Sequence, residues 1–213
     1  MRQAELNKLL NDALKESAKE HNWKYSRGFV FKGTELLFFS LIVVAQVKRF
    51  LLSCSLRYKF LAFDDLFWKI VGMEENLKQP LSFRAFGAWT APDESVSDVT
   101  LPVTDWNPTN LKSRVDELLV RSEADAANVT KQISNVDDNL RVVEELFARL
   151  KDTYPNAVTN VWVERLLTSI LKHNYDRAEA IILDRRNAHD YGGFPVGSKS
   201  FYDLALEYIR ALS

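Results

Sequence analysis

The chain has 213 residues, of which 46% are hydrophobic and 12% aromatic, and its formal net charge is −1. A chain of this size and composition can bury a large core, so it needs neither a disulfide framework nor a structural metal to fold. Its most apolar stretch, residues 36–45, is roughly half as long as a membrane-spanning helix, which excludes a membrane span there.

The first residues predict a helix that leads into a hairpin. Apolar residues recur at spacings of three and four over residues 3–20, which is typical of an amphipathic helix with a polar outer face. From Trp23 to Phe31, aromatic residues alternate with polar or small ones, and residues 32–34 supply a turn before the next apolar run. This pattern predicts the first hairpin of a sheet.

Two longer strands and one shorter strand are predicted next. Residues 37–46 are almost continuously β-branched or aromatic, as in a central strand covered on both faces. Residues 50–59 alternate with period two, so this strand has one buried and one wetter face and is expected to pair with the preceding one. A short helix over residues 63–71 and a strand around residues 82–90 complete this half of the chain.

The rest of the chain predicts a loop followed by helices. Residues 91–107 combine proline with clustered acidic and serine residues and lack a helical period, which indicates a connecting loop. Asn107 and Pro108 are typical of a helix start, and Asn135 or Asp137 can cap a second helix. Shorter helices are predicted over residues 158–172, 175–189 and 199–212.

Together these elements predict an α+β protein with an N-terminal helix, an antiparallel sheet of about four strands and a C-terminal bundle of about five helices. Residues 1–90 form the helix and sheet, residues 91–107 connect, and residues 108–213 form a helical region packed on the sheet as one compact unit. The single cysteine and the frequent charges of the N-terminal segment favour a soluble, cytoplasmic protein without an export signal.

Charge is distributed unevenly along the chain. Residues 91–138 contain ten acidic and four basic residues, whereas residues 1–90 carry a net charge of +5. Such asymmetry can mark a surface that binds a basic partner, although a solvated helix face and loop would show the same pattern. The candidate partner-binding residues are Asp116, Glu117, Glu123, Asp125, Asp137 and Asp138.

One motif suggests phosphate chemistry but has an ordinary structural explanation. Residues 192–200 read GGFPVGSKS, which looks like a phosphate-binding loop, but Ser198 separates Gly197 from Lys199. The segment also follows a predicted helix, whereas a phosphate-binding loop joins a strand to a helix. We therefore expect a helix-to-helix loop in which Ser198 caps the last helix.

Other reactive residue types also lack a catalytic or ligand-binding pattern. The three histidines, at positions 21, 173 and 189, show no metal-ligand spacing, and the last two lie near predicted helix ends. Cys54 is expected to be a buried hydrophobic side chain rather than a nucleophile. Basic residues at 48, 49, 57 and 59 bracket a strand instead of forming a nucleic-acid-binding stripe. We therefore expect no catalytic residue, metal, cofactor or nucleic-acid partner.

A small-ligand protein or enzyme is the competing hypothesis. It would use a pocket between sheet and helices, lined by aromatic residues and by two arginines: Trp23, Tyr58, Trp68, Trp89, Arg57 and Arg84. A third alternative is an oligomeric scaffold that associates through the helical half, and the sequence leaves the oligomeric state open.

Residues 3–90 also carry a resemblance to a known group of proteins. The N-terminal helix, the segment WKYSRGFVFKGTELLFF and the alternating segment FLLSCSLRYKF together resemble an uncharacterised bacterial family of helix-plus-antiparallel-sheet proteins. Some similar proteins look like immunity proteins, which protect a cell from a toxin that its neighbours deliver. The resemblance implies a non-catalytic, protein-binding inhibitor of a bacterial toxin. With the uneven charge distribution, we expect the acidic segment between Asp93 and Asp138 to meet a basic toxin.

Overall fold

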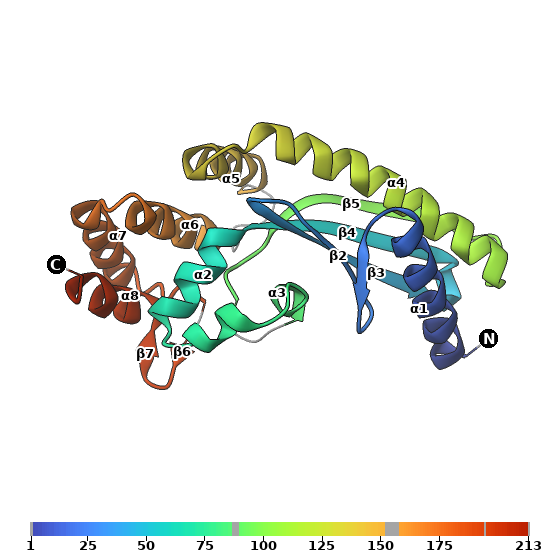
Figure 1. Cartoon of the computed structure of the whole chain (residues 1–213), viewed down its shortest axis with the longest axis horizontal. Coiled ribbons are helices and arrows are strands. Elements are labelled where there is room, and N and C mark those ends of the chain that lie inside the picture. The colour runs from blue at the N-terminus through green and yellow to red at the C-terminus, as the bar shows by residue number, and fades with distance from the viewer. Residues whose placement is uncertain (1, 87–89, 152–157, 194, 213) are drawn as a thin grey trace. The chain divides into compact units, whose positions relative to one another are not determined.

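The α+β class is confirmed by a computed structural model that describes residues 2–86, 90–151, 158–193 and 195–212. An N-terminal helix precedes an antiparallel sheet, and helices follow it (Figure 1). The sheet has five strands rather than about four. By internal contacts the chain divides into two compact units, each of which combines separate stretches of sequence.

The first of these, the sheet unit, comprises Met1–Lys59, Leu81–Phe86 and Asp93–Lys131. Its strands follow one another in space in chain order, as an antiparallel meander. Helix α1 (Gln3–Glu20) and the long strands β3 (Leu37–Gln46) and β4 (Leu51–Phe60) lie where the sequence predicts them. The predicted hairpin contains two strands of its own, β1 (Lys24–Ser26) and β2 (Phe29–Gly33).

Two predictions about the middle of the chain are wrong. Residues expected to be part of a connecting loop form strand β5 (Glu94–Pro102), which pairs with β4 from Leu51↔Pro102 to Tyr58↔Glu94. The strand expected around residues 82–90 is instead the short helix α3 (Phe83–Phe86), and residues 87–89, Trp89 among them, lie outside the described part. An acidic, hydroxyl-rich segment becomes a strand here because it can pair with the edge of β4.

Helices α1 and α4 (Pro108–Gln132) lie side by side, and α4 runs along the sheet (Figure 1). Lys112 of α4 binds Glu20 of α1 at 2.6 Å and Asp116 at 2.9 Å, Nζ to carboxylate oxygen. The Sγ of Cys54 on β4 lies 4.0 Å from Ser122 Oγ on α4, so α4 covers the face of β4 that carries Cys54. We call this the helical face of the sheet; it carries the apolar half of the alternating β4 pattern.

The opposite face of the sheet is covered at one end by residues 81–86. A Cβ added to Gly33 would lie 2.7 Å from Leu81 Cδ2, so a glycine at this position lets Leu81 approach the strand closely. Further along, Lys59 Nζ donates a hydrogen bond to the carbonyl of Arg84 at 3.0 Å. The short helix α3 therefore packs on the face away from α4.

The second unit, the helical unit, comprises Phe60–Pro80, Gly87–Pro92 and Gln132–Ser213. Phe67 and Phe201 are fully buried in this unit and stack with ring centroids 4.8 Å apart, which adds to the stabilisation from their burial. Its elements are α2 (Leu61–Ile70), the 3-10 helix η2 (Glu74–Lys78), α5 (Val136–Leu150), α6 (Val158–Leu171), α7 (Tyr175–Asn187), β6 (Pro195–Val196), β7 (Lys199–Ser200) and α8 (Phe201–Arg210). Helix α4 belongs to the sheet unit, so the five predicted C-terminal helices do not all share one unit.

Side-chain caps mark the starts of several helices. Asn107 Oδ1 accepts from the Asn110 amide at the start of α4, and Asn135 caps α5 as predicted. The predicted cap Ser198 is wrong, because it lies in the turn of the β6–β7 hairpin. Ser200 caps α8 instead and forms a capping box with Asp203.

No helix in the described ranges is both long enough and apolar enough to cross a bilayer. Helix α4 has 25 residues, a sufficient length, but charged side chains recur along it.

Candidate protein-binding surface

Part of the sheet's second face is uncovered. The rings of Phe39 and Tyr58 lie 6.3 Å apart, which puts the odd residues of β3 on the same face as the even residues of β4, the helical face. The even residues of β3 and the odd residues of β4 therefore share the other face. Across the β4–β5 pair, Ser55 is opposite Asp98, and Ser53 Oγ lies 3.1 Å from Thr100 Oγ1.

These positions define a surface that we call the open sheet face. Its aliphatic part lies at the end of β3, beyond the pairing of β3 with β2, which reaches Leu41; Ile42 is 41% exposed and Val44 is 51% exposed. Branched side chains of β-strands normally gain their stability by packing against another layer. The open sheet face consists of Ile42 and Val44 of β3, Ser53 and Ser55 of β4, and Asp98 and Thr100 of β5.

The only charge on the open sheet face is Asp98, which is exposed. Its surroundings are acidic as well, since residues 93–105 contain four acidic residues and no lysine or arginine. Two cations, Arg57 and Lys59, lie on the same side of β4, and both are engaged. Arg57 is paired with Asp93 at 2.5 Å, Nη1 to Oδ1, and Lys59 Nζ donates to the carbonyl of Arg84. A partner for this surface should therefore combine apolar and basic side chains.

The acidic residues predicted on α4 are mostly engaged inside the sheet unit. Glu117 lies between Arg114 and Arg121, at 2.7 and 2.5 Å, and these guanidiniums hold the pKa of its carboxyl below the usual value. Asp116 binds Lys112 and approaches His21 Nε2 at 3.5 Å. Burial acts to raise the pKa of Asp116, but its hydrogen-bonding and cationic partners outweigh that effect and lower it.

The other two acidic residues of α4 tie the helix to the sheet. Glu123 accepts hydrogen bonds from Trp23 Nε1 at 2.8 Å and from Lys32 Nζ at 2.6 Å. Asp125 accepts one from the hydroxyl of Ser97 on β5 at 2.7 Å. These contacts give both carboxylates a structural role, which the sequence did not indicate.

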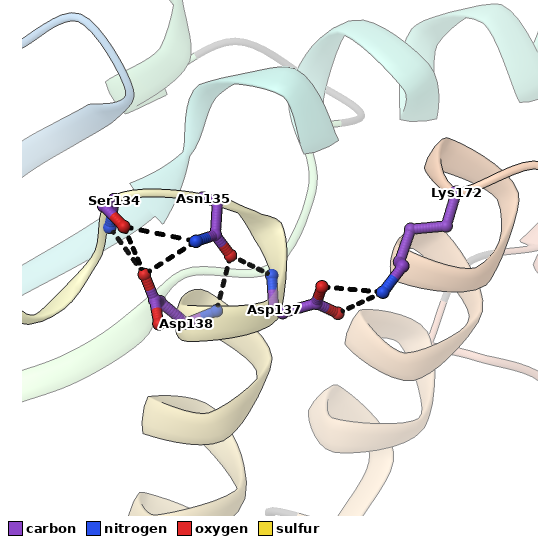
Figure 2. Close-up of polar contacts among 5 residues, drawn as sticks. All are labelled: Ser134, Asn135, Asp137, Asp138 and Lys172. Atoms are coloured by element: carbon purple, nitrogen blue, oxygen red, sulfur yellow. Dashed lines mark hydrogen bonds and ion pairs between the residues drawn. The ribbon is translucent and has the colours of Figure 1, made fainter.

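Asp137 and Asp138 lie in the helical unit, at the start of α5. Figure 2 shows that Asn135 Oδ1 accepts from both of their amides, at 2.9 and 3.0 Å, while Asp138 accepts from the amide and hydroxyl of Ser134. Those hydrogen bonds from Ser134 lower the pKa of Asp138. Asp137 binds Lys172, with its two oxygens 2.7 and 2.6 Å from Nζ.

The predicted acidic surface is therefore divided. Helix α4 carries four acidic and four basic residues, so it contributes no net charge. The acidic excess of residues 91–138 comes from the segment around β5 and from the start of α5, and these two segments belong to different units. Of the predicted set, Asp116, Glu117, Glu123 and Asp125 share helix α4 of the sheet unit, whereas Asp137 and Asp138 belong to α5 of the helical unit.

The structure does not bring together four of the predicted pocket residues, Trp23, Arg57, Tyr58 and Arg84. Arg57 and Tyr58 are consecutive on β4, so their side chains point to opposite faces. Trp23 is buried and bonded to Glu123 of α4, whereas Arg84 lies on α3 across the sheet. Two hollows of about 390 and 360 Å³ lie instead at the start of α1 and the end of β3, and Gln3 lines both.

Reactive side chains lie in settings that suit structural roles. Burial raises the pKa of the Cys54 thiol to about 11, as expected for a buried hydrophobic cysteine. His21 and Asp116 meet near Ser17, but Ser17 is fully buried, so a substrate would not reach its hydroxyl. Among the described residues, no group of three or more histidine, cysteine or acidic side chains is arranged to hold a metal.

One carboxyl has an unusual setting. Burial first, and the charge of Asp93 second, raise the pKa of Glu94 to about 7, while Arg57 opposes the rise. Glu94 begins β5, opposite Tyr58, and its Oε1 is buried without a hydrogen-bond partner among the residues that the structure describes. Loss of a proton there has an energetic cost.

Comparison with family models, with curated proteins and with solved structures gave no match to this chain.

Proposed function

We propose that this chain is a non-catalytic protein that binds a basic protein partner through the open sheet face, and that it acts in the cytoplasm as an immunity-type inhibitor of a bacterial toxin. The joint exposure of Ile42 and Val44 on one face of β3 is the observation that carries the proposal. Aliphatic side chains exposed together on one face mark an interaction site more often than isolated ones do. The acidic surroundings of Asp98 favour a basic partner.

The acidic residues of α4 contribute less to this proposal than the open sheet face does. Glu117 is bonded to two arginines, and Glu123 to a lysine and a tryptophan, so their charges are already balanced. Charge reversal at these positions would disturb the fold as well as any interface, and would not test binding cleanly. Substitutions on the open sheet face avoid this difficulty because Ile42 and Val44 are exposed.

A direct test is to express the native chain and the double variant Ile42→Lys/Val44→Lys in cells that also carry the neighbouring genes, and to purify each with whatever it binds. The partner would be identified by mass spectrometry, purified, and titrated by calorimetry at low and high salt. We expect a stoichiometric basic partner whose affinity falls at least about tenfold in the double variant, equivalent to ~1.4 kcal/mol. High salt should weaken the native complex.

The matched control is Val120→Lys, since Val120 is 56% exposed but lies on α4. This variant should bind like the native chain. A partner that the double lysine variant binds normally would refute the surface, and a chain that binds no protein would refute the function. To test the inhibitor role, cells would make the partner alone or with this chain, and unchanged toxicity would refute it.

A further inference from the structure

Strand β5 is the long edge of the sheet. Within the described part of the chain it hydrogen-bonds to β4 alone among the strands, and it has nine residues, whereas the opposite edge strand β1 has three. The outer side of an edge strand presents unpaired amide and carbonyl groups, which can receive a further strand. This is the backbone chemistry by which extended peptides add to a sheet.

The side chains of β5 decide which strand it can receive. Asp98 lies at the middle of β5, so antiparallel pairing of two copies about this centre would bring two Asp98 side chains together. Like charges directly opposite each other are destabilising in a sheet. A second copy of this chain paired about Asp98 is therefore disfavoured, and a strand with lysine or arginine opposite Asp98 is favoured.

The pleat fixes where the incoming side chains would lie. Asp98 and Thr100 point to the open sheet face, while Cys54 and its neighbour Val99 share the helical face. Because side chains alternate along a strand, every second residue of an added strand would lie beside Asp98 and Thr100. The favoured segment has basic residues at alternate positions on that side.

An irregularity limits the length of the new pairing. The register between β4 and β5 shifts at Leu56 and Arg57, where Leu56 is opposite Ser97 and Arg57 is opposite Ser95. A bulge of this kind interrupts regular pairing and increases the local twist. The regular part of β5 available to a partner is therefore residues 97–102.

We propose that residues 97–102 of β5 form a strand-addition site for an extended basic segment of a protein partner. This inference rests on the proposed protein-binding function and names the partner's contact: backbone hydrogen bonds at the edge, and alternating cationic side chains beside Asp98.

The test uses synthetic nine-residue peptides and the full chain labelled with ¹⁵N. The first peptide alternates lysine with threonine and valine, the second carries N-methyl groups on alternate amides of the same sequence, and the third has glutamate for lysine. N-methylation removes the backbone donors that strand addition needs but leaves the charge. We expect the lysine peptide to shift the amide resonances of residues 97–101, since Pro102 has no amide hydrogen, and to bind at least about tenfold more tightly than either other peptide.

Two variants complete the experiment. Asp98→Lys should abolish binding of the lysine peptide, whereas Glu35→Lys, at an exposed position between β2 and β3, should leave it unchanged. Equal binding of the N-methylated peptide would overturn strand addition, and equal binding of the glutamate peptide would overturn the basic chemistry. If the peptide binds at β5 but no natural protein partner is found, the proposed function is refuted and the strand-addition site is not. If a natural partner binds Asp98→Lys as well as the native chain, the strand-addition site is refuted and the proposed function is not.

Discussion

Lys32 of β2 and Glu123 of α4 lie 91 positions apart in the sequence, yet Nζ and Oε1 are 2.6 Å apart. The same carboxylate accepts the indole hydrogen of the buried Trp23. Glu123 therefore ties the long helix to the first hairpin of the sheet, at a distance in sequence that no local pattern reveals.

Removal of this carboxylate should destabilise the fold. In Glu123→Ala the buried Trp23 Nε1 loses its acceptor, and an unsatisfied buried donor costs about 1–3 kcal/mol. We expect the free energy of unfolding in urea to fall by that amount. Glu123→Gln should lose less, because its amide oxygen can still accept from Trp23.

The control for this prediction is Glu35→Ala, at an exposed position between β2 and β3, which should leave the stability nearly unchanged. Equal stabilities of Glu123→Ala and the native chain would show that the Trp23 and Lys32 contacts contribute nothing.

The stability of the chain should decrease as the pH rises from about 4.5 to 7 because of Glu94. The folded-state pKa of Glu94 is about 7, above its ordinary value of 4.5, so the folded chain holds a proton there that the unfolded chain has released. Glu94→Gln removes this dependence. At pH 8 the variant should be more stable than the native chain by on the order of 2 kcal/mol, and at pH 4 the two should be alike.

This prediction is checked by urea unfolding of both proteins at several pH values between 4 and 8. Parallel stability curves for the two proteins would contradict it, since they would show that Glu94 titrates alike in the folded and unfolded chains.

The thiol of Cys54 should resist modification in the folded chain. A pKa of about 11 instead of 9 lowers the thiolate fraction at neutral pH about a hundredfold, and burial adds a barrier to access. A maleimide reagent should therefore react slowly with the native chain and fast in guanidinium chloride. Because the sequence contains one cysteine, mass spectrometry reports on this site directly. Rapid native labelling would contradict the burial of Cys54.

The start of α5 depends on one side chain. Asn135 Oδ1 accepts from the amides of Asp137 and Asp138, and loss of such a cap costs about 1 kcal/mol. Asn135→Ala should lower the stability by this amount and speed hydrogen exchange of the first amides of α5. Asn135→Ser should retain most of the stability and most of the protection of these amides from exchange, because serine also caps helices. Identical behaviour of the alanine and serine variants would refute the capping role.

The elements that could be predicted from the sequence are those with local signals. The period of β4, the amphipathic pattern of α1 and the caps at Asn107 and Asn135 each depend on residues close in sequence. Strand β5 could not be predicted in this way, since its composition is that of a loop and its stability comes from pairing with β4. Its alternation of Val99 and Leu101 with Asp98 and Thr100 was the one available signal.

The candidate surface was harder to predict for the same reason. Acidic residues clustered in the sequence suggested a charged face on α4, but their partners include Lys32 and Trp23 from distant segments. Conversely, Ile42 and Val44 lie in a strand expected to be buried on both sides. Their exposure depends on which face the two helices and α3 cover, and that is a property of tertiary packing.

The order of segments in the sheet unit affects how the chain folds during its synthesis. Strands β4 and β5 are neighbours, but residues 61–92 leave the ribosome between them, and most of these belong to the helical unit. Neither unit can therefore fold completely before synthesis of the other has begun, and β4 remains without its outer neighbour meanwhile. During this time the nascent chain exposes the unpaired edge of a largely apolar strand, and we expect chaperones to bind it. A fragment that ends at residue 90 lacks β5, so its β4 edge would stay unpaired.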